Sequence, residues 1–305
     1  MELSKVNEQL RGSVKQPINL PTDRWWGRAL TRQLVRLAPA GDVSGVTITD
    51  SARRAPRVRV YRPDRQTSTA ALLWIHGGGM IIGRASMDDR LCASTARDLG
   101  ITVISVEYRL APEHRWGVMQ DDCLAGWTWL QRNAASLGVD PTRVVVGGQS
   151  AGGGLAAALV QRLVDAAGPQ PIAQWLFCPM LDDRTAANRA LDALDHFTWN
   201  NSINRFGWGA YLGTDPGATT PPPYAVPARR TDFSGFPPTW VGVGDIDLFH
   251  DEDMTFVASL EAAGVPVSTD IVPGAPHGFE SWAPDAQLSR DYVGRAQQWL
   301  KATIG

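Results

Sequence analysis

The sequence predicts an α/β protein built on a doubly wound, mostly parallel sheet. Two observations support this prediction: short, almost wholly apolar runs recur along the chain, and amphipathic stretches of helical length separate them. Strands that read as continuous apolar runs are buried on both faces, as in parallel sheets covered by helices. With 305 residues, the chain can form one large domain or a domain that carries an insertion.

The first part of the chain predicts helices followed by a hairpin. From residue 1 to about 40, apolar residues recur at helical spacing between arginines. We expect this segment to be helical and to lie over another part of the molecule. The alternating segments 43–49 and 57–61 then predict an antiparallel hairpin at a sheet edge, with residues 53–56 as its turn.

From residue 70 onward, strands and helices alternate. The expected strands are 70–75, 101–107, 143–146, 172–177, 239–243 and 267–272, and the expected helices are 85–100, 116–137, 151–167, 251–263 and 288–301. The alternation stops between residues 182 and 238, in an aromatic stretch followed by a proline-rich connection. So long an interruption is most simply an inserted cap, and together with the N-terminal helices it predicts a composite lid.

Composition and charge exclude several classes of function. Hydrophobic residues make up 44% of the chain and charged residues 20%, and the net charge is −2. This balance gives no electrostatic case for binding nucleic acid or an anionic membrane surface. The N-terminus has no apolar signal region, and no apolar run approaches the length of a membrane span. We therefore expect a cytoplasmic protein.

The cysteines point to the same compartment. Cys92, Cys123 and Cys178 are odd in number, widely spaced and free of C-x-x-C spacing. This pattern predicts reduced thiols, with no disulfide framework and no zinc or other metal site. We expect no cofactor.

The stretch 143–154, RVVVGGQSAGGG, predicts a strand, a sharp turn and a helix with Ser150 at the apex. Gly148 and Gly152 keep Cβ atoms out of the bend, and the serine hydroxyl would lie beside the positive end of the helix dipole. The alternative is a glycine-rich turn with an incidental serine. The bare G-x-S-x-G pattern arises by chance in roughly one chain of this size in ten, so other residues must decide.

A second glycine-rich segment follows the strand 70–75. It reads His76-Gly77-Gly78-Gly79, and three glycines let the backbone turn tightly and present unobstructed N–H groups. A merely flexible loop is the alternative, but His followed by three Gly occurs by chance in about one chain in several hundred. Because His76 precedes the turn, we expect it to fix the loop by hydrogen bonding rather than to act as a base.

A nucleophilic serine needs a histidine base and a carboxylate that orients it. Among five histidines, His277 follows the last expected strand, and loops at the carboxyl ends of parallel strands are where open α/β sheets form their sites. His250 begins a helix among acidic residues, where a solvated ion pair is expected. Asp245 and Asp247 both follow the penultimate strand, and the pattern leaves both open. The order Ser, Asp, His is that of α/β-hydrolases.

Six motifs occur together and in order: HGGG at 76–79, YRLAPE at 108–113, GQSAGG at 148–153, PMLDDR at 179–184, DLFHDE at 247–252 and HGF at 277–279. With them, the chain beyond about residue 40 resembles the bacterial hormone-sensitive-lipase group of carboxylesterases, within the α/β-hydrolases. The resemblance implies an eight-stranded, mostly parallel sheet flanked by helices. It also implies a catalytic domain of residues 43–183 and 238–305, and a helical cap made of residues 1–42 and 184–237.

The same resemblance implies roles for individual residues. Ser150 corresponds to the nucleophile, Asp247 to the orienting acid and His277 to the base, and the choice of Asp247 over Asp245 rests on the DLFHDE stretch. The N–H groups of Gly78, Gly79 and Ala151 correspond to the oxyanion hole. The chain departs from the family at Gln149, where an acidic residue is common, and at 114–117, which reads HRWG instead of the usual His-Pro-Phe-Pro.

These features predict a serine carboxylesterase that acts on short- to medium-chain or aryl esters through an acyl-enzyme. An amidase or arylacetamide deacetylase would use the same residues. A non-catalytic receptor on this fold, like the plant gibberellin receptors, lacks the histidine that this chain retains as His277. Candidates for an apolar substrate pocket are Met80, Trp25, Trp208 and Tyr211, although the aromatic residues could equally join the cap to the sheet. Strand 267–272 is a candidate edge for a homodimer.

Overall fold

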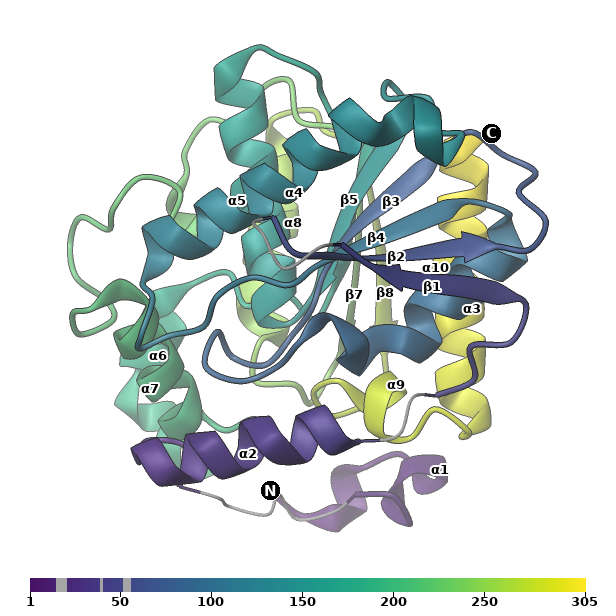
Figure 1. Cartoon of the computed structure of the whole chain (residues 1–305). Coiled ribbons are helices and arrows are strands. Elements are labelled where there is room, and N and C mark those ends of the chain that lie inside the picture. Colours follow the sequence, from purple (N-terminus) through teal and green to yellow (C-terminus); the bar gives the residue numbers. More distant parts are fainter. Residues whose placement is uncertain (15–20, 39–40, 52–55) are drawn as a thin grey trace.

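The computed structural model describes residues 1–14, 21–38, 41–51 and 56–305. Its centre is an eight-stranded sheet with the order β1-β2-β4-β3-β5-β6-β7-β8 (Figure 1). The strands are β1 (Val46–Asp50), β2 (Val58–Pro63), β3 (Ala71–Ile75), β4 (Thr102–Val106), β5 (Val144–Gln149), β6 (Ala173–Phe177), β7 (Thr239–Gly244) and β8 (Val267–Val272). Strand β2 is antiparallel to β1 and β4, and the other neighbours are parallel. The predicted fold class is confirmed, while most of the expected turn at 53–56 lies outside the described residues.

Helices cover both faces of the sheet. Helices α4 (Trp116–Leu137), α5 (Ala151–Ala166) and α8 (His250–Ala262) lie on one face, and α3 (Asp89–Leu99) and α10 (Gln287–Ile304) lie on the other (Figure 1). Successive side chains of a strand point to opposite faces, so Leu73 belongs to the core under α4 and α5 while Leu72 and Trp74 belong to the core under α3 and α10. Strands β3, β5, β7 and β8 run in the same direction. The loops that follow them therefore lie together at one edge of the sheet, at the carboxyl ends of the strands.

The segment between β6 and β7 lies beyond that edge. It contains α6 (Asp183–Ala187), a 3₁₀ helix (Arg189–Leu194) and α7 (Asn201–Leu212). Helix α2 (Trp25–Leu37) meets it, since the Arg28 guanidinium lies 5.4 Å from the centroid of the Phe206 ring. The two segments expected to form a composite cap are thus in contact, and the boundaries of that cap stay a prediction.

The described residues of the N-terminal segment form separate helices. They form a 3₁₀ turn (Leu3–Lys5) and the short helix α1 (Glu8–Arg11), which ends at Gly12 before the separate helix α2. Val6 and Leu10 are buried in the core that also contains residues of α10. The N–H of Asn7 donates to the carbonyl of Gly274 at 2.8 Å. The first residues therefore pack against the sheet domain and the loop after β8, because their apolar side chains are buried there.

Other expectations concern solubility and association. Among the described helices, none combines the length and apolar character needed to cross a bilayer. Cys92, Cys123 and Cys178 are free and buried. Strand β8 is an outer strand of the sheet, as a dimer edge requires. The cytoplasmic location and the homodimer stay predictions.

Candidate functional site

Ser150 occupies the turn between β5 and α5 with a strained backbone. Its φ of 56° and ψ of −123° are costly for any residue with a side chain. Three hydrogen bonds hold it there: its N–H donates to the carbonyl of Phe177 at 2.8 Å, and its carbonyl accepts from the N–H groups of Met180 and Gly154 at 2.9 and 3.0 Å. The neighbouring strand and the first turn of α5 thus fix the direction of the Ser150 hydroxyl.

Two glycines in the turn are required by direct backbone contact. A Cβ atom added to Gly152 would lie 2.0 Å from the carbonyl oxygen of Ile75 and 2.4 Å from that of His76. One added to Gly148 would lie 2.3 Å from the carbonyl oxygen of Gly152. No side chain fits at these distances. Close backbone contacts therefore require glycine on both sides of Ser150, which would not be expected of an incidental glycine-rich turn.

A chain of hydrogen bonds connects Ser150, His277 and Asp247. The Ser150 Oγ lies 2.9 Å from the Nε2 of His277, whose Nδ1 lies 2.8 Å from the Oδ2 of Asp247. The N–H of Phe249 donates to the other oxygen of Asp247 at 2.9 Å, and the Phe249 ring stands edge-on to the imidazole, with centroids 5.0 Å apart. Asp245 is exposed and accepts instead from the N–H of Gly274 at 2.6 Å. The fold thus brings Asp247, and not Asp245, to the histidine.

His76 serves the loop that follows β3. Its side chain is buried, and burial lowers the pKa of the imidazole. Its Nδ1 donates to the carbonyl of Gly77 at 2.8 Å, which fixes the tautomer because a carbonyl can only accept. The ring stacks on Tyr108 with centroids 4.2 Å apart, and the Tyr108 hydroxyl donates to the His76 carbonyl at 2.9 Å. These contacts are those of a residue that fixes the loop.

The glycine loop after β3 and the first residue of α5 lie beside Ser150. Gly78 and Gly79 have φ values of 114° and 59°, and among the described residues their N–H groups donate to no other group. Ala151 is the first residue of α5, so its N–H has no acceptor within the helix. A Cβ atom on Gly77 would lie 3.5 Å from the Cβ of Ser150. The glycine loop therefore lies directly beside the serine.

Helix α2 supports this loop through hydrogen bonds that no local sequence motif predicts. The Arg32 guanidinium donates to the carbonyls of Ile81 and Ala111 at 3.0 and 2.8 Å, and it forms a bidentate ion pair with Glu113. The N–H of Ala111 in turn donates to the carbonyl of Met80 at 2.9 Å. Part of the YRLAPE motif is thereby explained, because it joins the glycine loop to the N-terminal helix.

The four pocket candidates lie in different surroundings. Met80, Trp208 and Tyr211 are buried, and the rings of Trp208 and Tyr211 meet edge to face with centroids 5.8 Å apart. The Tyr211 hydroxyl accepts from Gln120 at 3.2 Å, so these two aromatic residues anchor α7 in the core. The expectation for Trp25 was wrong. Its side chain is 76% exposed because the start of α2 turns it to solvent, so it lines no closed pocket.

Trp199, which sequence reasoning did not single out, covers the site instead. A Cβ atom on Gly79 would lie 2.0 Å from the Trp199 ring, and the ring centroid is 6.4 Å from that of His277. The adjacent Thr198 hydroxyl donates to the His277 carbonyl at 2.8 Å. Ser150 and His277 are 6% and 8% exposed. The sequence signal for Trp199 was an aromatic side chain among several in the inserted segment.

Gln149 has a partner that explains its neutral side chain. Its Nε2 donates to the Oε1 of Glu280 at 2.5 Å and to the Oγ of Ser281 at 2.8 Å. Glu280 is buried, and burial raises the pKa of its carboxyl. An acidic residue at position 149 would place a second carboxylate against this one, and two such charges repel. The departure from the family at Gln149 therefore fits the residue that faces it.

One group of side chains in the site has the composition of metal ligands. Ligand atoms of Cys178, Asp247 and His277 all lie within 4.8 Å of one another. Burial raises the pKa of the Cys178 thiol well above its ordinary value, and a protonated thiol is a poor ligand because metals bind the thiolate. The hydrogen bond between Asp247 and His277 already occupies the other two residues. We assign no metal to this group.

Parallel strands that deliver a serine, an aspartate and a histidine, in that order along the chain, to one edge of the sheet define an α/β-hydrolase. The model of a family described as "alpha/beta hydrolase fold" matches residues 72–281. The chain belongs to this family and, within it, to the hormone-sensitive-lipase group of carboxylesterases. The resemblance drawn from the six motifs is confirmed.

Relatives with known names agree with this assignment. Ethyl acetate hydrolase of Pseudomonas putida is 34% identical over 254 residues, which cover 78% of this chain and 75% of that protein. Esterase LipI of Mycobacterium tuberculosis is 32% identical over 307 residues, covering 99% of this chain and 89% of that one. The crystal structure of esterase LipW from Mycobacterium marinum matches with a TM-score of 0.86 at 30% identity, over 99% of this chain and 97% of that chain.

The Gly152→Ala variant tests the backbone contact at the turn. Its Cβ would meet the carbonyl oxygens of Ile75 and His76 at 2.0 and 2.4 Å, so β3 or the turn must shift. We expect the free energy of unfolding, measured with urea, to fall by about 1–3 kcal/mol. Gly168→Ala is the control, because that glycine is exposed and has no atom within 4 Å of the added Cβ. Equal stability of Gly152→Ala and the unmodified protein would contradict the contact.

Proposed function

We propose that this carboxylesterase hydrolyses its substrates through an acyl-enzyme formed on Ser150. The observation that carries the proposal is the hydrogen-bonded chain from Ser150 through His277 to Asp247, with distances of 2.9 and 2.8 Å. His277 Nε2 takes the proton of Ser150 as Oγ attacks the ester carbonyl carbon. Asp247 keeps the Nδ1 proton in place and stabilises the imidazolium that forms.

The negative charge of the tetrahedral intermediate falls on the former carbonyl oxygen. The N–H groups of Gly78, Gly79 and Ala151 donate to it, and one such donor typically contributes about 3–4 kcal/mol to lowering the barrier. His277 then returns its proton to the leaving alcohol as the ester bond breaks. A water molecule, deprotonated by His277, attacks the acyl-serine and releases the acid and free Ser150.

We propose short- to medium-chain or aryl esters as substrates. The Trp199 ring lies against Gly79 and limits the space beside the glycine loop where the acyl group must lie. The relative from Pseudomonas putida is named as an ethyl acetate hydrolase, which supports a short acyl group. A non-catalytic receptor is disfavoured because His277 is present and in contact with Ser150.

The Ser150→Ala variant tests the nucleophile. We expect the hydrolysis of p-nitrophenyl acetate and butyrate to fall to the level of the uncatalysed reaction, because no other group can form the acyl-enzyme. The far-UV circular dichroism and the thermal midpoint should stay near those of the unmodified protein. Turnover that survives in a folded Ser150→Ala protein would remove Ser150 from the mechanism.

A pair of variants distinguishes the two aspartates after β7. Asp247→Asn should lower kcat by roughly 10³–10⁴-fold, because an amide cannot hold the required imidazole tautomer or stabilise its cation. Asp245→Asn should keep most of the activity, since its amide oxygen can still accept from Gly274. The measurement is kcat for p-nitrophenyl butyrate at constant pH. The reverse ranking would make Asp245 the orienting acid.

The Trp199→Ala variant tests what limits the acyl chain. Removing the indole opens space beside Gly79, so we expect the ratio of kcat/KM for hexanoate over acetate esters to rise by about tenfold. Trp26→Ala is the matched control, because Trp26 lies on the cap helix α2 and is half exposed. A ratio that rises equally in both variants, or in neither, would contradict this role for Trp199.

A further inference from the structure

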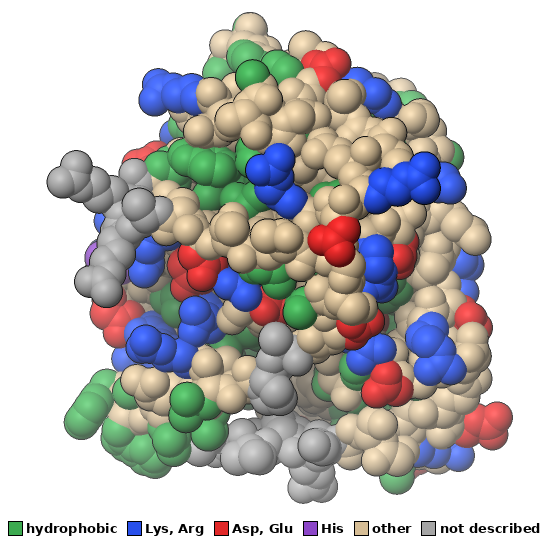
Figure 2. Space-filling model, turned by 45° about the vertical axis from the view of Figure 1, so that its right-hand side comes forward, with side chains coloured by type: hydrophobic (Ala, Val, Ile, Leu, Met, Phe, Trp, Pro, Cys, Tyr) green, Lys and Arg blue, Asp and Glu red, His purple; other side chains and the backbone are tan. Residues whose placement is uncertain are grey.

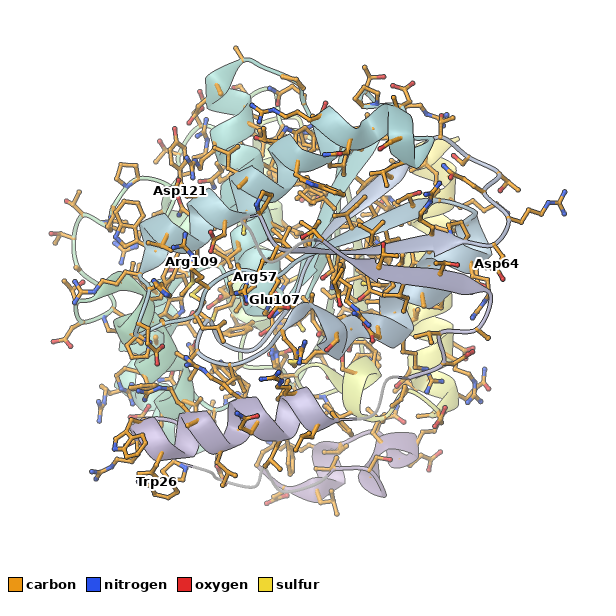
Figure 3. The ribbon with its side chains drawn as sticks, in the orientation of Figure 1. Trp26, Arg57, Asp64, Glu107, Arg109 and Asp121 are labelled. Carbon is orange, nitrogen blue, oxygen red and sulfur yellow. The ribbon has the colours of Figure 1, made fainter. Side chains whose placement is uncertain are left out.

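Helix α2 presents its apolar side to solvent. The exposed fractions of its large apolar side chains are 76% for Trp25, 49% for Trp26, 46% for Leu30, 51% for Leu34 and 77% for Leu37. Residues three and four apart share one side of a helix, so Trp26, Leu30, Leu34 and Leu37 form a continuous strip, called here the α2 apolar face. Trp25 is exposed at the start of the helix beside this strip. Trp26 points away from the sheet (Figure 3), and hydrophobic side chains gather at the lower left of the molecule (Figure 2).

The opposite side of α2 is basic and faces the protein. Arg28 is buried, donates to the carbonyls of Thr22 and Asp23, and lies over the Phe206 ring. Arg32 donates to the two carbonyls beside the glycine loop. An amphipathic surface helix normally packs its apolar side on the core and points its charges outward. Here that orientation is reversed, and exposed apolar strips of this kind mark interaction sites.

The size of the face argues against a second protein chain. Helix α2 has 13 residues and is about 20 Å long. A stable protein interface buries about 800 Å² on each partner, which is more than one side of so short a helix supplies. Ala29 and Gln33 are the exposed residues between the apolar ones, so the face offers little for directional hydrogen bonding. Insertion into the apolar part of a lipid layer requires neither a large contact area nor directional hydrogen bonds.

The charged residues of α2 indicate which kind of lipid surface the α2 apolar face would bind. Arginine occurs at positions 24, 28, 32 and 36, and α2 contains no acidic residue. Arg24 and Arg36, near the two ends of the helix, are exposed. Basic residues beside an inserted apolar side attract anionic lipid headgroups. Arg24 forms an ion pair with Asp23 at 3.6 Å and Arg32 one with Glu113 at 2.9 Å. Arg36 is exposed and forms no ion pair with any described residue, so it is the arginine available to a lipid phosphate.

We propose that the α2 apolar face docks the enzyme onto an anionic lipid–water interface. The helix lies in the plane of the headgroups, with Trp26 and its leucines among the acyl chains and Arg36 beside the phosphates. Arg32 of the same helix bonds the backbone next to the glycine loop. Docking therefore places the candidate active site next to the phase in which apolar esters dissolve.

The test is co-sedimentation of the full-length protein with vesicles of phosphatidylcholine, with and without phosphatidylglycerol. We expect binding to the anionic vesicles, and a loss of about tenfold or more in the double variant Leu30→Gln, Leu34→Gln, because two apolar side chains no longer insert. The matched control is Met87→Gln, Ile271→Gln, which alters two side chains that are each 43% exposed outside α2. It should bind like the unmodified protein.

A second variant examines the charge. Arg36→Gln should weaken binding to anionic vesicles by about fivefold and leave binding to neutral vesicles unchanged. All these variants should hydrolyse soluble p-nitrophenyl acetate normally, so a failure of docking is distinguishable from a failure of the proposed catalytic mechanism.

Three outcomes would overturn the proposal. In the first, the unmodified protein does not sediment with anionic vesicles. In the second, the Leu30→Gln, Leu34→Gln variant binds these vesicles as tightly as the unmodified protein. In the third outcome, sedimentation velocity shows a dimer that this double variant converts to a monomer, with vesicle binding unaltered. A second copy of the chain would then cover the face.

Discussion

The site depends on one close approach between backbones, where the turn after β5 packs on the end of β3. Gly148 and Gly152 allow this approach because the carbonyl oxygens of Ile75 and His76 occupy the space that Cβ atoms would need. The contact sets the position of the glycine loop relative to Ser150 through main-chain atoms alone. In the proposed mechanism, N–H donors held in this way need no reorganisation when charge develops. Side chains such as Tyr108 and Arg32 then hold the loop in that position.

Most of the sheet could be predicted from the sequence because its signals are local. Apolar runs mark the buried parallel strands, and the predicted helix 116–137 coincides with α4. The predictions that failed concern positions whose surroundings depend on contacts between residues far apart in the sequence. The orientation of α2 depends on Arg28 and Arg32, whose partners include Phe206 and Ile81. The aromatic character of the expected cap suggested that Trp25 would line a pocket, but it could not show which side of α2 faces the protein. Trp199 was missed for the same reason, since its importance comes from the proximity of Gly79.

In the candidate site, too, some features follow from local sequence patterns and others only from contacts between distant residues. Ser150 and the glycine loop have local sequence patterns, and strand order predicts that an acid and His277 meet them. The choice between Asp245 and Asp247 could not come from the residues alone, because both follow the same strand. In the structure, the turn after β7 directs Asp247 to His277 and Asp245 to the N–H of Gly274. Likewise, the neutral Gln149 makes sense beside Glu280, a partner 131 positions away.

The pairing of Asn7 with Gly274 has a consequence for how cap function can be studied. Val6 and Leu10 fill part of the core, and the N–H of Asn7 bonds the loop that leads to His277. A truncation that removes the first dozen residues together with α2 would open a void under the sheet and loosen the support of the histidine loop. Loss of turnover after such a deletion would report damage to the proposed base, His277, rather than a missing lid. Point substitutions on the outer side of α2 separate the two effects.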